Sequence, residues 1–240
     1  MTVDIDYSRQ SVFINPAKFA GISASVIGCG ATGSAVALLM AQSGFGGKGQ
    51  GTLKLFDFDE VEAHNLPNQA FHCHHVGMNK SKALADLIMS KTGIEATAFP
   101  IRVEDQVVAE SDYVFLLVDS MSGRRDIGEN LIKTSSSVKL VIETRMGLTE
   151  GRVYAFDPRD SKQYQAWADS LYDDDQAETS SCGTSLSCAV TANLIAGMAV
   201  SRWLQHQDWN GGMQYLKSRH YQNQMPDERF VSFFPEMILL

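Results

Sequence analysis

A glycine-rich turn near the amino terminus constrains the fold of this chain more than any other feature. The turn reads Gly28-Cys29-Gly30-Ala31-Thr32-Gly33 and fits the spacing GxGxxG. An apolar run, Ala24–Ile27, precedes the turn, and an alanine-rich segment, Ala35–Gln42, follows it. The run predicts a short buried strand and the segment predicts an apolar helix, so we expect the turn to join a strand to a helix.

Each glycine of the turn has its own expected role. Gly28 permits the tight turn, Gly30 lets the backbone approach a phosphate, and Gly33 lets the helix pack close to the strand. The free amide groups and partial positive charge at the start of the helix favour an anion there. Asp57 ends the next predicted strand, where a carboxylate can accept hydrogen bonds from both hydroxyls of a ribose. This pattern alone predicts NAD, and a glycine turn without a nucleotide is the alternative.

Further strands and helices alternate along the chain. The other expected strands are Thr52–Phe56, Ala96–Arg102, Tyr113–Val118 and Val138–Glu143, and the other expected helices are Asn79–Thr92 and Ala189–Met198. The stretch from Gly44 to Gly51 holds five glycines and predicts a flexible loop. The alternation predicts an α/β fold with a Rossmann-like, doubly wound and largely parallel sheet.

Polar residues follow the expected strands at their carboxyl ends. These residues are Gly28, Asp57, Asp119, Glu143 and Arg145. Because ligands of open α/β sheets bind beyond the carboxyl ends of the strands, this edge of the sheet is the expected binding site.

Length and composition exclude several classes of protein. The 240 residues are interpreted as one domain spanning 1–240. A formal net charge of −8 argues against nucleic-acid and membrane-surface binding, and no apolar stretch approaches the length of a membrane span. The amino terminus is polar and acidic, unlike a signal peptide. The four cysteines form no CxxC pair, which argues against a zinc ribbon and favours free thiols in a reducing cytoplasm.

Short motifs follow one another in a fixed order. They are Tyr7-Ser8-Arg9-Gln10, Asp57-Phe58-Asp59-Glu60-Val61, Asn65-Leu66-Pro67-Asn68-Gln69, Gly77-Met78-Asn79-Lys80 with Ala83, and Asp119-Ser120-Met121-Ser122-Gly123-Arg124. Together they resemble the R-Y-S-R-Q, D-x-D-x-V-x-x-x-N-L-x-R-Q, G-x-x-K-x-x-A and D-x-x-x-x-R signatures of the ThiF/MoeB/HesA family. The resemblance covers about residues 7–200 and favours this family of ubiquitin-activating-enzyme-like proteins over NAD-dependent enzymes.

The resemblance implies an activity and a set of partners. Members of the family use ATP with Mg²⁺ to adenylate the C-terminal carboxylate of a ubiquitin-like or sulfur-carrier protein. The reaction needs charge neutralised on the phosphates rather than a strong base. A related enzyme acting on a peptide or another substrate is the alternative within the same chemistry.

The resemblance also implies roles for individual residues. It places Lys80 on the phosphates, Asp119 on Mg²⁺, Asn65 near the reacting phosphate, and Asp57 on the ribose, with Asp59 in the same signature. It implies a homodimer in which Arg9 reaches the partner's site.

The chain departs from the family pattern in three places. Asn68 stands where the family has an arginine, and an amide cannot replace a guanidinium as a bidentate phosphate clamp. Either Arg124, Arg125 or Arg145 compensates, or activity is reduced, or the chain is a catalytically degenerate nucleotide-binding scaffold. The amino-terminal arm is short, and the family's zinc-binding cysteine pairs are missing.

Cysteine and histidine residues offer two further candidates. Cys182 precedes the small-residue helix, and a cysteine before the equivalent helix bonds the activated carboxyl terminus in several related proteins. A thiol at a helix start favours the thiolate, and the alternative is a cysteine that only packs. Cys188, on the helix, is expected to be buried and inert. The run His72-Cys73-His74-His75 suggests a metal site, but adjacent residues of an extended stretch point to opposite sides and make poor shared ligands. We interpret the run as a polar connection between elements.

Overall fold

The computed structural model describes residues 5–11, 14–103, 110–133, 135–148, 150–176, 187–207 and 227–232. Within these ranges, seven strands form one sheet in the order β3-β2-β1-β4-β5-β6-β7. The strands are β1 (Ser23–Ile27), β2 (Thr52–Phe56), β3 (Thr97–Phe99), β4 (Tyr113–Leu116), β5 (Leu140–Met146), β6 (Glu150–Phe156) and β7 (Asp227–Ser232). Strands β1 to β5 are parallel, whereas β6 runs antiparallel to both of its neighbours, β5 and the edge strand β7. The predicted Rossmann-like, largely parallel α/β fold is confirmed.

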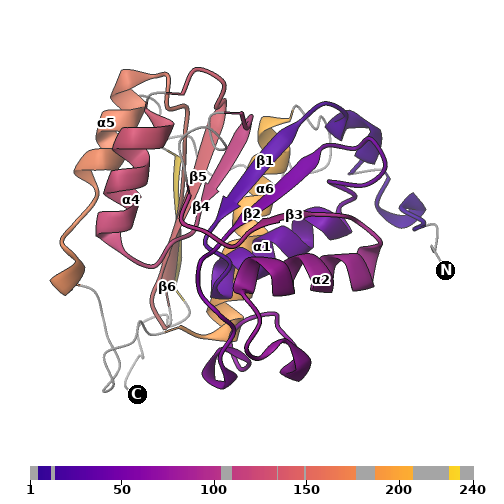
Figure 1. Ribbon diagram of the computed structural model, residues 1–240. Coiled ribbons are helices and arrows are strands. Elements are labelled where there is room, and N and C mark those ends of the chain that lie inside the picture. The colour runs from indigo at the N-terminus through magenta and orange to yellow at the C-terminus, as the bar shows by residue number, and fades with distance from the viewer. Residues whose placement is uncertain are drawn as a thin grey trace, which may run out of the picture.

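Helices cover both faces of the sheet (Figure 1). They are α1 (Ala31–Gln42), α2 (Lys80–Thr92), α4 (Met121–Ile127), α5 (Ser161–Asp169) and α6 (Ala189–His206). A π-helical turn, Gly128–Ile132, continues α4, and 3-10 turns span Ser8–Gln10, Pro16–Phe19, Ala63–Asn65, Cys73–His75 and Asp174–Gln176. Helices α1, α2 and α6 lie on one face of the sheet, and α4 and α5 lie on the other.

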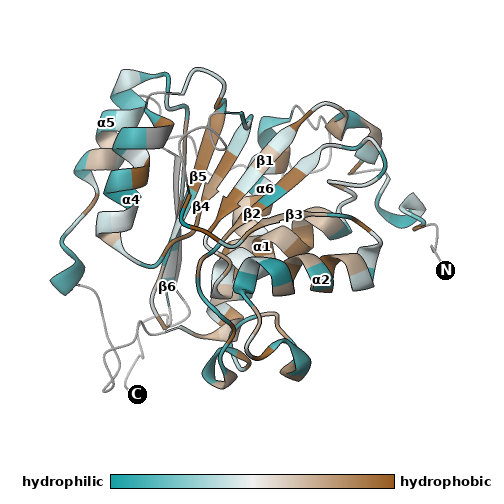
Figure 2. Ribbon diagram, in the orientation of Figure 1, coloured by the Kyte–Doolittle hydropathy of each residue, from teal (hydrophilic) through white to brown (hydrophobic). Residues whose placement is uncertain are grey.

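Two apolar cores follow from this arrangement, one on each face. The strands between the helices are mostly hydrophobic, and the outer helix faces are mostly hydrophilic (Figure 2). The larger core joins β1, α1, α2 and α6, whereas the smaller core packs Tyr164 and Trp167 of α5 against Phe156 of β6. None of the described helices is long and apolar enough to cross a membrane.

The glycine-rich stretch before β2 is part of the larger core. Phe45 is fully buried, and its ring contacts Phe19 and Trp203 with centroid distances of 5.3 and 5.1 Å. Gly44 and Gly46 adopt positive φ angles of 91° and 90°, which other residues rarely adopt. The sequence predicted a flexible loop here, but the buried aromatic side chain fixes its first half to the core.

Helix α6 is longer than predicted and continues to His206. It packs directly against α1 within the same chain. The apolar character of these two helices is therefore used largely inside the chain. Exposed apolar residues remain on α6, where Val190 and Leu194 are 62% and 45% exposed.

Candidate nucleotide-binding site

The glycine turn joins β1 to α1 at the carboxyl edge of the sheet. Gly28 has a φ of 91°, and a Cβ atom there would lie 2.6 Å from the carbonyl oxygen of Leu117. A Cβ on Gly33 would lie 1.9 Å from the carbonyl oxygen of Gly28, so α1 packs directly on the turn. A Cβ on Gly30 would meet nothing within 4 Å. The turn is therefore closely packed behind and open in front.

The start of α1 is left open by its capping residue. Gly30 is the N-cap, and none of the residues that the structure describes caps the first turn of the helix with a side-chain hydrogen bond. Unsatisfied N–H groups at a helix start, together with the helix dipole, make a suitable site for a phosphate group.

Asp57 lies next to the turn and is held in a fixed position. Its Oδ2 accepts a hydrogen bond from the backbone N–H of Cys29 at 2.7 Å, and its Oδ1 accepts one from the N–H of Asp59 at 2.9 Å. Burial raises the pKa of this carboxyl, although both backbone hydrogen bonds and the charge of Lys80 oppose the rise. Each carboxylate oxygen still has capacity to accept a second hydrogen bond.

Lys80 is tied to the same segment. Its Nζ lies 3.0 Å from Asp59 Oδ2, and its backbone N–H donates to the carbonyl of Asp59 at 2.8 Å. Asn79 caps α2 by accepting from Ser81 N at 3.0 Å, and its Nδ2 donates to the carbonyl of Asp57 at 2.9 Å. These bonds place the Lys80 ammonium and the Asp57 carboxylate on one rigid unit.

Asn65 is buried in the connection between β2 and α2. Its Oδ1 accepts from the N–H of Glu62 at 2.8 Å, which completes a capping box on the Ala63–Asn65 turn. Among the described residues, the Nδ2 donor of Asn65 has no hydrogen-bond partner. It is therefore available to another acceptor.

Asp119 follows β4 and is exposed to solvent. The nearby start of α4 is capped by Ser120, whose Oγ accepts from Gly123 N at 3.2 Å. Asp174 caps the same helix from a distant segment, because its carboxylate accepts from the N–H groups of Met121 and Ser122. Hydrogen bonds from the Ser122 side chain and from these N–H groups lower the pKa of Asp174. They hold the Asp174–Gln176 turn against the start of α4, next to Asp119 in the chain.

Asn68, which replaces the family arginine, is part of a different contact. Its Nδ2 donates to Ser187 Oγ, just before α6. Two of the arginines that were expected to compensate are committed elsewhere. Arg124 and Arg145 are 4% and 7% exposed, and both lie on the buried carboxylate of Glu143, at 2.6 and 3.0 Å. Each guanidinium balances a charge inside the protein, which argues against compensation by Arg124 or Arg145, whereas Arg125 is exposed.

One predicted site residue, Arg9, is not brought to this edge by its own chain. Arg9 lies in the arm whose Gln10 Nε2 donates to the carbonyl of Gln42 at 3.1 Å, at the far end of α1 from the turn. The helix spans 12 residues, or about 18 Å, so Arg9 is remote from its own chain's turn. Cys182 lies outside the described residues.

Cys188 differs from the sequence prediction. It is half-buried, and it is the N-cap of α6 rather than a residue within the helix. The backbone N–H groups of Val190 and Thr191 lower the pKa of its thiol. The sequence carried a signal for this position, because the predicted helix begins at Ala189 and the residue before a helix is its cap.

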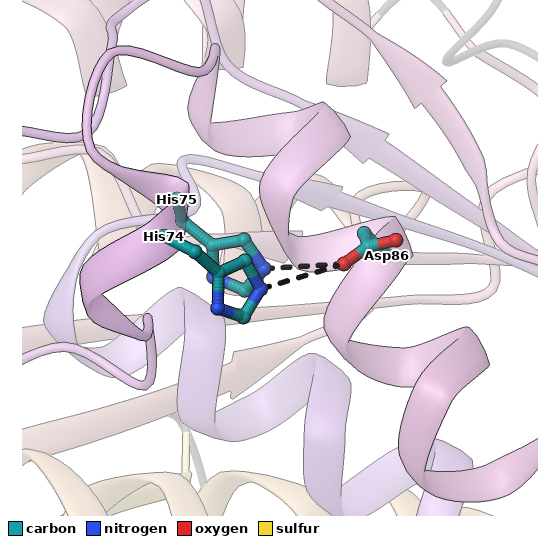
Figure 3. A group of neighbouring side chains, drawn as sticks. All are labelled: His74, His75 and Asp86. Atoms are coloured by element: carbon teal, nitrogen blue, oxygen red, sulfur yellow. Dashed lines mark hydrogen bonds and ion pairs between the residues drawn. The ribbon is translucent and has the colours of Figure 1, made fainter.

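The histidine run forms a 3-10 turn at Cys73–His75, so the prediction of an extended stretch is wrong. His74 and His75 both face Asp86 of α2, with Nε2–Oδ2 distances of 4.0 and 3.2 Å (Figure 3). His75 Nδ1 accepts from the N–H of His72 at 3.1 Å, so in the neutral ring the proton lies on Nε2 and is donated to Asp86. A metal ion would need that nitrogen without its proton. The hydrogen bonds therefore favour a structural tie between this turn and α2.

The fold and this edge define a class of protein: a Rossmann-like α/β protein with an open glycine turn and a fixed carboxylate on neighbouring strands. The chain belongs to the ThiF family, whose model matches residues 9–236.

Two curated relatives are similar to parts of this chain, and a solved structure shows the same fold. The chain is 30% identical over 127 residues to the ATP-dependent ubiquitin transferase-like protein Cap2 of Pseudomonas aeruginosa, covering 52% of this chain and 22% of that one. It is 40% identical over 85 residues to the adenylyltransferase and sulfurtransferase MOCS3 of Xenopus laevis, covering 33% and 18%. The crystal structure of E. coli MccB with ATP matches with a TM-score of 0.63 at 15% identity, covering 93% of this chain and 67% of that chain. The chain spans about a fifth of the length of these curated relatives.

Proposed function

We propose that this chain binds ATP with Mg²⁺ at the carboxyl edge of the sheet and adenylates the C-terminal carboxylate of a ubiquitin-like or sulfur-carrier protein. The observation that carries the proposal is the open glycine turn beside the fixed Asp57–Lys80 unit. Membership of the ThiF family supports the same chemistry.

The phosphates of ATP would lie against Gly30 and the open start of α1. Among the described residues, no side chain caps that helix start with a hydrogen bond, and a Cβ on Gly30 would meet nothing within 4 Å. Lys80 would supply positive charge to the phosphates, and the Nδ2 donor of Asn65 would bind an oxygen near the reacting phosphorus. Asp57 would hold the ribose, since each of its oxygens can accept one more hydrogen bond.

Asp119 would hold Mg²⁺, which arrives with ATP as part of the substrate. An exposed carboxylate at the end of β4 suits a hard cation that keeps several of its waters. Bound there, the ion would neutralise charge on the phosphates.

The proposed reaction is a displacement at the α-phosphorus. An oxygen of the substrate carboxylate forms a bond to this phosphorus, and the bond to the pyrophosphate leaving group breaks. A carboxylate is already ionised, so no base is required, and Lys80 acts by stabilising the negative charge that moves to pyrophosphate. The names of the relatives, a ubiquitin transferase-like protein and a sulfurtransferase, support a protein substrate.

The proposal includes a homodimer and a transfer step. Arg9 lies far from its own turn, which is consistent with action on a partner's site. After adenylation, the thiolate of Cys182 would attack the activated carbonyl carbon and release AMP. The proposal places the protein in the cytoplasm, where reducing conditions keep thiols free. Replacing Cys182 with Ser should leave pyrophosphate exchange intact and abolish a reducible adduct with the substrate protein. A substrate that is adenylated but never forms such an adduct with the unmodified chain removes Cys182 from the mechanism.

A nucleotide-binding scaffold without catalysis is the second candidate function. The amide of Asn68 bonds Ser187 instead of offering a guanidinium to the phosphates, and neither Arg124 nor Arg145 is free to replace it. Both candidates bind ATP, so they differ only in turnover.

Thermal unfolding with ATP and Mg²⁺ tests the shared part of both candidates. ATP should stabilise the protein more with Mg²⁺ than without, and Asp119→Ala should remove the Mg²⁺-dependent part while leaving the apo protein folded. Asp126→Ala, an exposed aspartate on α4, is the matched control and should behave as wild type. If Asp119→Ala keeps the full Mg²⁺ effect, the metal role of Asp119 is wrong. If ATP does not stabilise the wild type, the nucleotide site is wrong.

A further inference from the structure

A cavity lies between α4 and α5, on the face of the sheet opposite α1 and α2 (Figure 1). Its volume is about 200 Å³, below the roughly 300 Å³ at which pockets for drug-sized ligands begin. Arg125 and Glu129 line it from α4 and the π-helical turn, and Tyr164 and Trp167 line it from α5. None of these residues has a role in the proposed nucleotide site. The cavity therefore suits a small molecule and is separate from the ATP-binding edge.

The aromatic wall of the cavity is held in place by the core. Trp167 is fully buried, stacks on Phe156 at a centroid distance of 4.9 Å, and points its indole N–H to Glu143. A Cβ on Gly128 of the π-helical turn would lie 2.5 Å from the Trp167 ring, so the turn packs directly against this wall. Turns of π-helix within helices are frequent at functional sites. The shape of the cavity is thus set by packing before any ligand arrives.

Tyr164 has an unsatisfied hydroxyl group beside this cavity. The residue is 4% exposed, and among the described residues its Oη has no hydrogen-bond partner. Burial and the nearby charge of Glu129 raise the pKa of this phenol to about 12, so the proton is retained at neutral pH. A buried hydroxyl without a partner is unfavourable, and an acceptor atom in the cavity would satisfy it. The hydroxyl therefore favours a ligand that offers an oxygen acceptor.

Two opposite charges line the same cavity without neutralising each other. Arg125 and Glu129 are exposed and four positions apart, yet within the described part of the chain neither forms an ion pair. Asp169 also lines the cavity, but its Oδ1 already accepts from Gln165 Nε2 at 2.7 Å. One guanidinium and one carboxylate are left for a ligand. A small molecule that carries both a carboxylate and an ammonium group complements the two charges.

We propose that this cavity binds a small α-amino acid. The carboxylate of the ligand accepts hydrogen bonds from Arg125 and from the Tyr164 hydroxyl, and its ammonium group donates to Glu129. Ala168 and Leu171 are partly buried against the smaller core and also line the cavity, which suits a short apolar side chain. The inference goes beyond the proposed function and does not rest on it, because it uses none of the ATP-binding residues.

Titrations followed by the amide NMR shifts of α4 and α5 test the proposal with matched probes. Glycine, L-alanine and L-valine are each compared with the acid that lacks the ammonium group and the amine that lacks the carboxylate. For L-valine these probes are isovalerate and isobutylamine. At least one amino acid should shift the amides saturably. Its amine, which loses two contacts, should bind about 4- to 50-fold more weakly, and its acid, which loses one, about 2- to 5-fold.

Three variants separate the individual contacts. Tyr164→Phe removes only the hydroxyl and should weaken the amino acid by about 2- to 10-fold, the range for one hydrogen bond. Arg125→Ala and Glu129→Gln should each weaken it by about 2- to 5-fold, as for exposed ion pairs. The control Lys162→Ala removes an exposed cation of α5 that does not line the cavity, and it should bind as wild type does.

Each outcome decides one claim. If none of the three amino acids shifts these amides, the cavity holds only water and the proposal is wrong. If the acid or the amine binds as tightly as the amino acid, the cavity does not recognise a zwitterion, which also overturns the proposal. Wild-type affinity in Tyr164→Phe would overturn the assigned contacts. ATP with Mg²⁺ is titrated into the same samples, because absence of ATP binding contradicts the proposed function alone.

Discussion

The three glycines of the 28–33 turn differ in what a side chain would meet. A Cβ on Gly33 collides with backbone at 1.9 Å, whereas a Cβ on Gly30 meets open space. Spacing in the sequence was sufficient to predict these roles, because the strand–turn–helix geometry follows from the GxGxxG pattern. The partner of Asn68 was not predictable, because Ser187 is far away in the chain and comes close only through the fold.

The two glycines give a paired prediction. Gly33→Ala should destabilise the protein by about 1–3 kcal/mol, because the backbone of the turn must shift to admit the methyl group. Gly30→Ala should change stability by less than about 1 kcal/mol, yet weaken ATP, since its methyl group fills the space in front of the turn. Urea unfolding and ATP titration measure the two effects. Gly33→Ala with wild-type stability, or Gly30→Ala with wild-type ATP affinity, would contradict this description of the turn.

The thiol of Cys188 gives a pH-dependent prediction. The N–H groups of Val190 and Thr191 lower its pKa, so its thiolate should be present at lower pH in the folded protein than in the unfolded chain. Alkylation by iodoacetamide, followed at this residue by peptide mass analysis, should show its rate midpoint at lower pH in buffer than in urea. Cys29 is buried and its pKa is raised, so it should stay unmodified in the folded protein. A midpoint that is the same or higher in buffer would contradict the capping geometry.

At the scale of elements, Glu143 in the middle of β5 and Arg145 near its end tie this strand to α4 and to the end of α5. The Glu143 carboxylate forms ion pairs with Arg124 of α4 and with Arg145. The Nη1 of Arg145 also donates a hydrogen bond to the carbonyl of Ser170 at 2.7 Å. The indole N–H of Trp167 also points to Glu143, at 3.4 Å. The sequence predicted polar residues at this strand end, but it could not show that they neutralise one another in the interior.

The bounds of the helices and strands were also predicted only in part. The alternating pattern and the glycine signals predicted β1, β2 and α2 to within a residue. The end of β3 was placed too late: Pro100 follows Phe99 and cannot donate to a ladder, so the strand stops there. Strands β6 and β7 and helices α4 and α5 were missed. For α5 the sequence carried a signal, because Asp160 is an N-cap residue and the buried Tyr164 and Trp167 are three positions apart.

Glu143→Gln should be strongly destabilising. It leaves two buried guanidinium groups without a charge partner, and breaking a buried pair typically costs about 3–5 kcal/mol. Glu129→Gln, an exposed glutamate in the π-helical turn, is the control and should change stability by less than about 0.5 kcal/mol. Urea unfolding at neutral pH provides the comparison. If the free energy of unfolding of Glu143→Gln lies within about 1 kcal/mol of wild type, the arginines are solvated rather than buried.

At the scale of the whole molecule, the parallel sheet collects residues from distant motifs at one edge. Gly30, Asp57, Lys80 and Asp119 are spread along the chain, yet the sheet order places their strands and helix starts side by side. The sequence could predict this edge because parallel strands all end there. It could not predict that Arg9 lies at the other end of α1.

The remote position of Arg9 gives a prediction about assembly. If the protein is a two-fold homodimer and Arg9 acts on the partner's site, chains carrying Arg9→Ala should be complemented by chains carrying Asp119→Ala. In the mixed dimer one site keeps both residues, so part of the adenylation activity should return after subunit exchange. Mass measurement of the mixed species serves as the control for exchange. Exchange without any recovered activity would show that Arg9 has no role across the interface.

Exchange of labelled pyrophosphate into ATP tests the central claim most directly, because it requires reversible adenylation and nothing later. In the presence of Mg²⁺ and a ubiquitin-like carrier protein ending in Gly-Gly, wild type should catalyse the exchange. Lys80→Ala should slow it by at least about a hundredfold, since charge is lost where it develops in the transition state. Lys82 is exposed and lies two positions further along α2, and the control Lys82→Ala should leave the exchange rate unchanged. ATP binding without exchange for any such carrier, or exchange that survives Lys80→Ala unchanged, would contradict the account.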